Sequence, residues 1–353
     1  MTKIAMYFDM RNPPGWRQGW HEYYEKILGY ASAGDDAGLD AFWVTEHHFF
    51  EDGYLPQPLT FLAAVAARTK KMRLGTAVLL APLRKSIQIA EEAAIVDILS
   101  NGRLELGLGT GYRKPEFDPF DAPFDHRWDT TDQRIREIRD WWEGGRMMPP
   151  MVQKRAPIWC GYQGPKGALR AGRLGENLLS LYPQLYEPYV QGLREAGLDA
   201  SRAVMGGPLH GYLVDDPEKA WDEIGKHVQY QWDSYKRYGI EGTGKPFHPV
   251  NLDDFRAWGE DGALPPYFLA TPEQMAKAIR ERLAGLPIDT IFMWSDIAGL
   301  PNHWIERHLE LIPRLKAALG DLASQPAPEK RLPWQARLIV KEANIDKAAA
   351  PRS

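Results

Sequence analysis

Short apolar runs alternate with longer amphipathic stretches along most of the chain, as far as about residue 319. In 21–38, for example, Tyr24, Ile27 and Ala31 recur with the spacing of one helix face. The near-continuous apolar run 72–80 is typical of a strand that is buried on both faces of a parallel sheet. The pattern predicts strands at 3–9, 41–47, 72–80, 103–111, 157–162, 177–181, 204–214 and 289–295. It predicts helices at 21–38, 56–70, 85–100, 129–143, 165–174, 185–196, 218–238 and 302–319, and a further helix that is capped by Thr271.

Eight strand-like segments, each followed by a helical one, predict parallel strands that are joined by right-handed crossovers. Eight such units in one chain favour closure into an α/β fold of the (β/α)8 TIM barrel type, with a doubly wound open sheet as the alternative. A chain of 353 residues is long for one domain but ordinary for a single barrel. We therefore predict one barrel over 1–320, followed by a C-terminal extension over 321–353 that either wraps the barrel or frays.

One long segment interrupts this alternation. Residues 239–270 separate the seventh and eighth units and are rich in aromatic residues, glycine and proline. A loop of this length in a compact barrel is usually functional or mobile. We predict a lid insertion at the C-terminal face of the barrel, where the active sites of this fold lie. A passive surface insertion is the alternative.

The composition excludes some classes of partner and site. The net charge is −4 and Lys and Arg form no basic run, so we expect no nucleic-acid partner. Cys160 is the single cysteine, which excludes an intramolecular disulfide and a cysteine-based zinc site and fits a reducing compartment. The N-terminus lacks the apolar stretch of a secretory leader, and no apolar run reaches the roughly 18 residues that suggest a membrane span. We therefore expect a cytoplasmic protein without a membrane partner.

Aromatic residues are the unusual component. Many of the 13 Trp, 15 Tyr and 12 Phe fall in predicted loops rather than in the periodic apolar segments. Such residues either pack at the periphery or line a pocket for a flat, apolar ligand. The pattern alone leaves both interpretations open.

The predicted strand ends place candidate chemistry at one mouth of the barrel. Glu46, His47 and His48 directly follow the second strand, and an imidazole beside a carboxylate can transfer protons near neutral pH. Adjacent histidines on an extended chain point to opposite sides, so we expect no metal site here. The strand ends also predict a substrate pocket that contains Phe8, His48, His210 and Trp294.

Two glycine-rich turns could bind a ligand through their main chain. The fourth strand ends in the alternating Gly107, Gly109 and Gly111, which would let the backbone approach a ligand closely. It is no dinucleotide-binding fingerprint, because no helix begins directly after it. The fifth strand leads through the turn 161–167 into a helix, whose free N–H groups and dipole would attract phosphate, with Lys166 adding a charge. An ordinary strand-to-helix turn is the alternative there.

The motifs at these strand ends resemble, in the same order, those of the bacterial-luciferase-like flavin monooxygenases. The stretch 43–49, which contains Glu46 and His47, resembles the strand-two signature of that family. The resemblance continues through 74–78, 90–103, 106–109, 116–117, 157–175 and 271–274. It covers roughly residues 3–319 and is specific to the superfamily, although not to a substrate.

This resemblance implies a barrel that binds reduced FMN at its C-terminal face. His47 matches the catalytic histidine of the family, Glu46 its neighbouring carboxylate, and Glu116 a carboxylate at the edge of the pocket. Ala77 and Val78 fall where many members have a non-prolyl cis peptide under the isoalloxazine ring, and Gln163 and Gly164 fall where the backbone holds the phosphate. The cofactor contacts that we expect are Ala77, Val78, Gly109, Thr110, Tyr162, Gln163, Gly164 and Lys166.

Thr110 departs from the pattern, because luciferase itself has a phosphate-binding arginine at this position. Threonine can donate one hydrogen bond but cannot neutralise charge, so Lys166 or Arg113 would have to replace that arginine. The superfamily also contains enzymes that use the deazaflavin F420 and react without oxygen. The pair His47 and His48 resembles the oxygen-using branch more closely, which favours FMN.

The function that the resemblance implies is an FMN-dependent monooxygenase of the two-component kind. A separate flavin reductase would supply reduced FMN, oxygen would add to the flavin as a hydroperoxide, and a small apolar substrate would be oxygenated. His47 would act as general acid and base, tuned by Glu46. F420-dependent hydride transfer on the same fold and a non-catalytic flavin-binding protein are the alternatives. A homodimer that packs on barrel helices is also expected.

Overall fold

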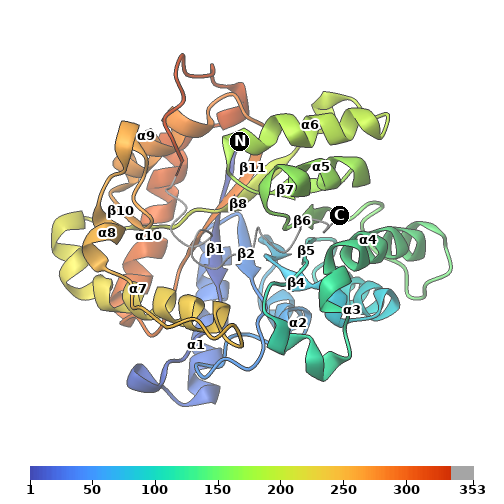
Figure 1. Cartoon of the computed structure of the whole chain (residues 1–353), viewed down its shortest axis with the longest axis horizontal. Helices are drawn as coiled ribbons and strands as arrows, with labels where there is room; N and C mark the ends of the chain where they lie inside the picture. Colours follow the sequence, from blue (N-terminus) through green and yellow to red (C-terminus); the bar gives the residue numbers. More distant parts are fainter. Residues whose placement is uncertain (335–353) are drawn as a thin grey trace.

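The computed structural model describes residues 1–334, and a closed barrel of parallel strands lies at its centre (Figure 1). Around the barrel the strands are β1 (Lys3–Phe8), β2 (Ala41–Val44), β3 (Arg73–Thr76), β5 (Leu104–Gly109), β6 (Ile158–Cys160), β7 (Asn177–Leu179), β8 (Met205–Pro208) and β11 (Ile288–Trp294). Strand β11 pairs with β1, and β3 pairs with both β2 and β5, so the barrel has no free edge. This closure confirms the TIM barrel and contradicts the open-sheet alternative.

Helices surround the barrel in Figure 1. They are α1 (Trp20–Asp36), α2 (Pro58–Arg68), α3 (Ser86–Leu99), α4 (Arg127–Glu143), α5 (Gly164–Leu174), α6 (Tyr186–Glu195), α7 (Pro217–Gly239), α8 (Leu252–Arg256), α9 (Pro272–Leu283) and α10 (Asn302–Leu319). The start of α9 illustrates how sequence sets a boundary. The Thr271 side chain accepts a hydrogen bond from the Gln274 N–H, and the Gln274 side chain accepts one from the Thr271 N–H, as predicted for a capped helix.

Two predicted strands are each divided in two. The segment 72–80 is interrupted by a cis peptide bond between Ala77 and Val78, which confirms the expected cis bond, and continues as β4 (Leu79–Leu80). The segment 204–214 leaves the barrel after Pro208, and β9 (Gly211–Leu213) pairs instead with β10 (Phe268–Ala270) in a separate two-stranded sheet. An apolar run shows that a segment is buried, but it does not show which partner strand buries it.

Side-chain alternation divides β1 between two packed layers. Ile4, Met6 and Phe8 face the helices and join the larger apolar cluster, whereas Ala5 and Tyr7 face the barrel interior. Large aromatic side chains fill that interior: Trp43 stacks on Phe292 at 5.0 Å and meets Trp159 edge-on at 6.0 Å between ring centroids. Gly75 makes room for this packing, since a β-carbon there would lie 2.3 Å from the Trp43 ring. The barrel is therefore closed below its mouth.

The insertion and the first part of the C-terminal extension are ordered against the barrel. Residues 239–270 contain α8, a short 3-10 helix and β10. The extension returns to the barrel at Leu322, whose N–H donates to Thr2 Oγ1 at 3.0 Å. Further on, Arg282 Nε donates to the Pro333 carbonyl at 2.8 Å, and Trp334 is buried. The described part of the extension thus wraps the barrel, and 335–353 lie outside the described residues.

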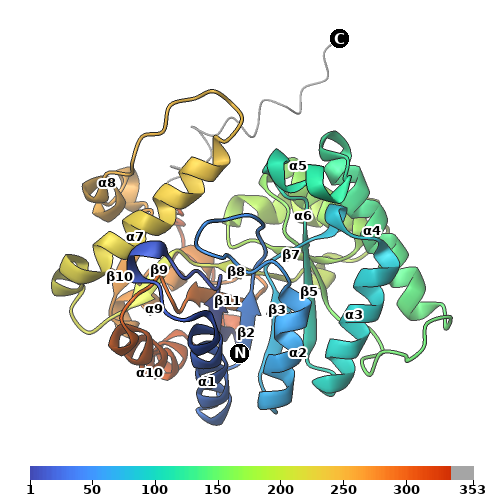
Figure 2. The same cartoon turned by 90° about the horizontal axis from the view of Figure 1, so that it is seen from below.

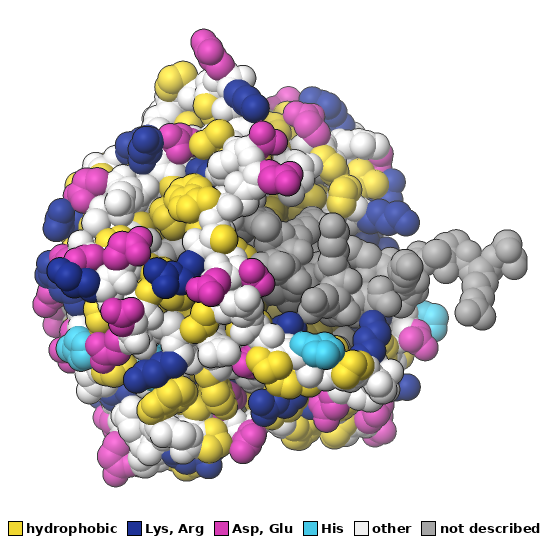
Figure 3. Space-filling view, turned by 60° about the vertical axis from the view of Figure 1, so that its left-hand side comes forward, with side chains coloured by type: hydrophobic (Ala, Val, Ile, Leu, Met, Phe, Trp, Pro, Cys, Tyr) yellow, Lys and Arg dark blue, Asp and Glu magenta, His cyan; other side chains and the backbone are white. Residues whose placement is uncertain are grey.

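The outer surface carries charges of both signs. On the face in Figure 3, Lys and Arg side chains are interspersed with Asp and Glu side chains and with hydrophobic groups. No helix within residues 1–334 is both long and apolar enough to cross a membrane.

Candidate functional site

The loops that follow the barrel strands meet at the mouth, where α7 lies beside the loop after β2 (Figure 2). Glu46, His47 and His48 follow β2, Glu116 follows β5, and all four side chains are buried. Parallel strands bring these sequence-distant residues together because their carboxyl ends share one rim. The structure thus brings the three predicted catalytic residues to the same end of the barrel.

His47 pairs with Glu116. Its Nδ1 lies 2.8 Å from Glu116 Oε1, and its Nε2 lies 3.3 Å from the Tyr112 hydroxyl. Burial alone would raise the pKa of Glu116, but His47, the backbone N–H of His48 and the nearby Arg113 together lower it. Glu116 is therefore ionised at neutral pH and accepts from Nδ1, which leaves His47 Nε2 facing the mouth as a proton donor or acceptor.

Glu46 pairs with His48 instead of His47, which corrects the expectation that it tunes the catalytic histidine. Its Oε1 lies 2.7 Å from His48 Nε2 and accepts from Arg84 at 2.6 Å. Its Oε2 accepts from the N–H of Leu80 at 2.8 Å. The reason is geometric: successive residues of an extended segment point to opposite sides, so Glu46 and His48 share a side that His47 does not. Glu46 therefore anchors β4 and the turn that follows it.

The cis peptide between Ala77 and Val78 forms a half-buried shelf at the mouth. The Tyr7 hydroxyl donates to the Ala77 carbonyl at 2.9 Å. A β-carbon at Gly109 would lie 2.2 Å from the Val78 side chain, and one at Gly161 would lie 2.4 Å from it. These glycines thus make room for the shelf. In the fourth predicted strand, Gly109 therefore allows a close approach of Val78 from the neighbouring strand.

Aromatic rings form a continuous wall from His47 to the shelf. Consecutive centroids lie 4.8 to 6.2 Å apart along His47, Tyr54, Tyr235, Trp232, His210, Trp294 and Tyr7. Tyr112 extends the wall beyond His47, with centroids 5.2 Å apart. We call these eight residues the aromatic wall. Burial lowers the pKa of His210 to about 4, so its imidazole is neutral in the physiological range.

The other predicted pocket residues have different places. Trp294 and His210 belong to the aromatic wall, but Phe8 is fully buried on the helix side of β1 and stacks on Phe42 at 5.1 Å. The residue of β1 that reaches the mouth is Tyr7, because side chains alternate along the strand. The prediction that Phe8 lines the pocket is therefore wrong by one position. His48 is buried against Glu46 and Phe120 rather than in the wall.

A buried ionic network supports the wall from behind, and motif reasoning missed it. The guanidinium of Arg11, which is fully buried, donates to Asp9 at 3.1 Å and to Asp52 at 2.7 Å. It also lies over the rings of Tyr54 and Tyr235, at 4.6 and 4.4 Å from their centroids. Asp9 carried one signal in the sequence, its position at the end of the first strand. Nothing in the sequence pairs Arg11 with Asp52.

The glycine-rich turn after β6 opens into α5 as predicted. Gly164 has a φ of 72° with open space where a β-carbon would stand, and the side chain of Gln163 does not cap the helix. The first N–H groups of α5 and the exposed Lys166 are therefore available to an anion. Tyr162 differs from expectation: its buried hydroxyl donates to Asp132 at 2.5 Å in the helix layer, so only its backbone can contribute.

The residues weighed as substitutes for a phosphate-binding arginine are not equivalent. The Thr110 hydroxyl donates to the carbonyl of Gly111 at 3.2 Å and is buried. Arg113 is also buried, donates to the His48 carbonyl at 2.8 Å and forms an ion pair with Glu241. Since Arg113 is fully engaged, Lys166 is the remaining candidate of the two.

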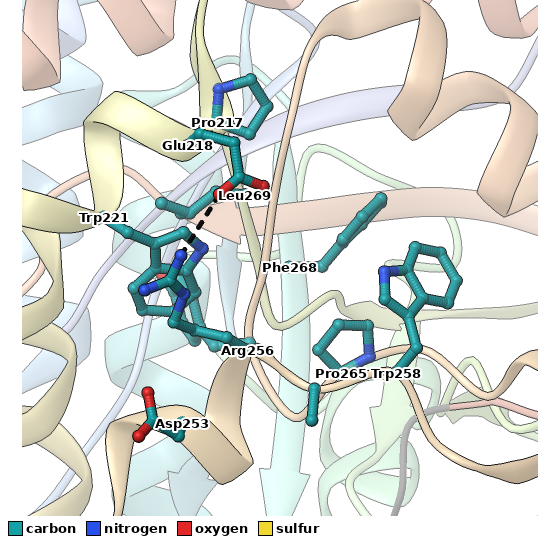
Figure 4. Close-up of a pocket in the computed structure, with 11 residues that line it drawn as sticks. Pro217, Glu218, Trp221, Asp253, Arg256, Trp258, Pro265, Phe268 and Leu269 are labelled. Atoms are coloured by element: carbon teal, nitrogen blue, oxygen red, sulfur yellow. Dashed lines mark hydrogen bonds and ion pairs between the residues drawn. The ribbon is translucent and has the colours of Figure 1, made fainter.

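A separate cavity of about 330 Å³ lies away from this mouth, among α7, α8 and β10 (Figure 4). Trp221 and Trp258 line it, and an ion pair of 3.3 Å joins Arg256 to Glu218 at its side. It shares no residue with the aromatic wall. Within residues 1–334, no group of three or more His, Cys, Asp or Glu side chains is arranged to hold a metal ion.

Comparisons with known proteins agree with this geometry. The trigonelline monooxygenase of Acinetobacter baylyi, a flavin-dependent enzyme, has an oxygenase component that is 30% identical over 291 residues, covering 74% of this chain and 77% of that protein. An F420-dependent glucose-6-phosphate dehydrogenase of Amycolatopsis mediterranei is 26% identical over 319 residues, covering 84% and 86%. The crystal structure of the monooxygenase RslO1 from Streptomyces bottropensis matches with a TM-score of 0.74 at 23% identity, covering 90% of this chain and 99% of its own. Residues 4–290 match the family described as luciferase-like monooxygenase, and the chain belongs to that family.

Proposed function

We propose that this protein is the oxygenase of a two-component monooxygenase, which uses reduced FMN and oxygen to oxygenate a small organic substrate. The observation that carries the proposal is the position of the His47–Glu116 pair, because His47 belongs to the same aromatic wall that reaches the Ala77–Val78 shelf. A proton-transfer group, a flat shelf and an aromatic enclosure at one mouth suit flavin chemistry on an apolar molecule. The flavin-dependent relative from Acinetobacter baylyi supports this choice.

The residues present fit a flavin mononucleotide. The half-buried shelf offers a flat surface for the ring system, and the uncapped start of α5 with Lys166 offers N–H groups and a charge for the phosphate. When bound, the reduced flavin would supply the electrons that activate oxygen. The aromatic wall would keep water away from the reaction, and His47 Nε2 would hold or deliver the proton while Glu116 fixes the ring through Nδ1.

The segment 239–270 would act as a lid in this enzyme. It meets the site through Glu241, whose carboxylate pairs with Arg113, and Arg113 in turn lies 3.7 Å from Glu116. Just before it, the tilted ring of Tyr238 packs against Phe50 at 3.9 Å between centroids. These contacts connect the end of α7 to the loops that carry the His47–Glu116 pair.

Binding titrations test the cofactor assignment. The protein should quench or shift the spectra of FMN and reduced FMN on binding, and it should bind riboflavin, which lacks the phosphate, more weakly. Lys166→Ala should weaken FMN binding about five- to tenfold and leave riboflavin binding unchanged. This factor corresponds to roughly 1–1.4 kcal/mol for the loss of one charge-assisted contact. Lys154→Ala, at an exposed lysine of another loop, is the matched control.

F420 is the second candidate cofactor, which the relative from Amycolatopsis mediterranei favours. Titration with F420 under anaerobic conditions separates the two assignments. Binding of F420 in preference to FMN would overturn the monooxygenase proposal in favour of hydride transfer. If neither cofactor bound, both proposals would fail.

We further propose a flavin reductase as the donor of reduced FMN and a homodimer as the assembled form. The relative from Acinetobacter baylyi, described as an oxygenase component, supports the first. The second is supported by α3, on which Ile95, Ile98 and Leu99 are 46%, 37% and 51% exposed. Light scattering tests the dimer. A molar mass of two chains for the wild type that falls to one chain in the double variant Ile95→Glu and Leu99→Glu would support the dimer, and a monomeric wild type would exclude it.

A further inference from the structure

We infer that the substrate is a flat aromatic molecule that is uncharged or cationic, and that the mouth discriminates against aromatic anions. The inference rests on the proposed function only for the location of the substrate, which would lie between the aromatic wall and the shelf. It depends on three observations: the aromatic rings of the wall, the hydrogen bonds that its polar groups already make within the protein, and the ion pairs that nearby arginines form with carboxylates.

The wall presents ring faces and edges to whatever enters the mouth. Its members come from strands β1 and β11, from the loops after β2, β5 and β8, and from α7, so the rings converge from separate elements at one end of the barrel. Tyr112, Tyr235 and His210 are only partly buried and form the accessible part of the wall. Aromatic side chains attract flat rings by stacking and edge-to-face contact, and their faces attract cations.

Several polar hydrogens of the wall already bond to protein acceptors, and the indole N–H of Trp232, which has no partner, is buried. The Trp294 indole donates to Asp9 at 3.1 Å, and the Tyr7 hydroxyl donates to the Ala77 carbonyl at 2.9 Å. The hydroxyls of Tyr54 and Tyr235 lie 3.0 Å apart, so one of them donates to the other. Donation of the indole hydrogen to a carboxylate leaves that ring richer in electrons. An entering anion would find few free donors, whereas a ring or a cation needs none.

Each arginine near the mouth already has a carboxylate partner. Arg11 pairs with Asp9 and Asp52, Arg84 with Glu46, and Arg113 with Glu241. One nitrogen of Arg11, Nη2, has no hydrogen-bond partner, but the side chain is fully buried behind the tyrosines and two carboxylates balance its charge. A substrate carboxylate would therefore lose its hydration at this mouth without gaining an ion pair from these arginines.

Three nearly isosteric probes test the inference directly: benzamide, benzamidinium and benzoate at pH 7. Binding is measured on the FMN-loaded protein by ligand-observed NMR and by quenching of tryptophan fluorescence. We expect benzamide and benzamidinium to bind at least tenfold more tightly than benzoate. Benzoate binding that equals or exceeds that of benzamide would overturn the inference.

Two variants of the aromatic wall test whether the probes bind there, and a third variant controls for binding in the outer cavity. Tyr235→Leu removes a partly exposed ring and should weaken benzamide and benzamidinium several-fold. Trp294→Phe keeps a ring but replaces the indole with one that attracts cations less strongly, so it should mainly weaken benzamidinium. Trp258→Phe changes the exposed tryptophan of the cavity in Figure 4 and should leave all three affinities unchanged. Loss of binding in Trp258→Phe alone would mean that the probes occupy the outer cavity, which also overturns the inference.

The FMN titration separates this inference from the proposed function. If FMN binds but benzoate binds as tightly as benzamide, the inferred substrate class is wrong and the monooxygenase proposal stands. If FMN does not bind while the free protein still prefers benzamide to benzoate, the cofactor assignment fails and the character of the mouth is upheld. Thermal melts of each variant identify those that fail to fold.

Discussion

The two histidines after β2 are neighbours in sequence but belong to different regions of the molecule. His47 lies at the mouth, among the rings of Tyr54, Tyr112 and Tyr235, with Glu116 behind it. His48 lies on the opposite side of the segment, where Glu46 connects it to Arg84 and to the backbone of Leu80. Both are His–carboxylate pairs of about the same length, 2.8 and 2.7 Å. One pair faces the space where a substrate would bind, and the other holds a turn in place.

The difference shows that a His–carboxylate pair is not catalytic by its chemistry alone. His47 keeps one ring nitrogen towards the mouth, whereas the ring of His48 is enclosed by Glu46 and Phe120. The carboxylates differ as well: Glu116 receives its bonds from His47 and the His48 backbone, and Glu46 receives a guanidinium. We therefore expect mutations of one pair to change turnover and mutations of the other to change stability.

The largest effect is expected for His47→Ala. Removal of a general acid and base costs about 10²- to 10⁴-fold in turnover, while flavin binding should remain largely intact because the shelf and the start of α5 are unchanged. Turnover of the wild type and the variant with a shared aromatic substrate, together with FMN titration, measures both. His48→Ala is the matched neighbour and should lose stability more than turnover. Full turnover by His47→Ala would show that its role is assigned wrongly.

The next largest effect is expected for Glu46→Ala. It leaves the buried guanidinium of Arg84 without its carboxylate and releases the N–H of Leu80, and loss of one partner from a buried pair costs about 3–5 kcal/mol. Urea unfolding at pH 7 measures the change. Arg68→Ala breaks an exposed ion pair with Glu25 and should cost less than about 1 kcal/mol. Equal losses in the two variants would contradict the anchoring role of Glu46.

A smaller effect with a distinct pH dependence is expected for Glu116→Gln. The folded protein holds the pKa of Glu116 below its ordinary value, so this carboxylate stabilises the fold above the pKa of the unfolded chain. That stabilisation is lost as the pH falls through the lower, folded pKa. The variant should thus be less stable at pH 7 by about 1.5–3 kcal/mol, the value of a hydrogen bond to a charged group. The gap between wild type and variant should narrow as unfolding is repeated towards pH 3, and a constant gap would argue against an ionised Glu116.

The smallest effect is expected for Glu241→Gln, at the contact between the proposed lid and the mouth. The side chain of Glu241 is 45% exposed, so the ion pair with Arg113 should contribute only about 0.2–1 kcal/mol. Hydrogen exchange of 239–250 should nevertheless become faster, since this pair fastens the segment beside α7. Glu260→Gln in the same insertion is a suitable comparison. Unchanged exchange in Glu241→Gln would mean that other contacts hold the segment.

The strand ends and the cis bond were predictable, but the side-chain partners were not. Hydrophobic periodicity located the barrel strands, and the family resemblance located the cis bond between Ala77 and Val78. The choice of Phe8 was wrong by one residue. Sequence patterns locate a strand end only approximately, and because side chains alternate between the two faces, an error of one residue selects a side chain on the wrong face. Arg11 and Asp52 carried no signal, because their pairing depends on contacts between loops that are distant in sequence.

The sequence by itself determined most of the order of strands and helices, favoured closure into a barrel and placed Glu46, His47 and His48 at its mouth. These follow from local periodicity and from the rule that parallel strands present their carboxyl ends at one rim. Only the tertiary structure decided that Glu116 supports His47, that Glu46 anchors the turn after the shelf, and that eight rings form one wall. Such pairings depend on side-chain direction and on distances between separate loops, which a linear pattern of apolar and polar residues does not contain.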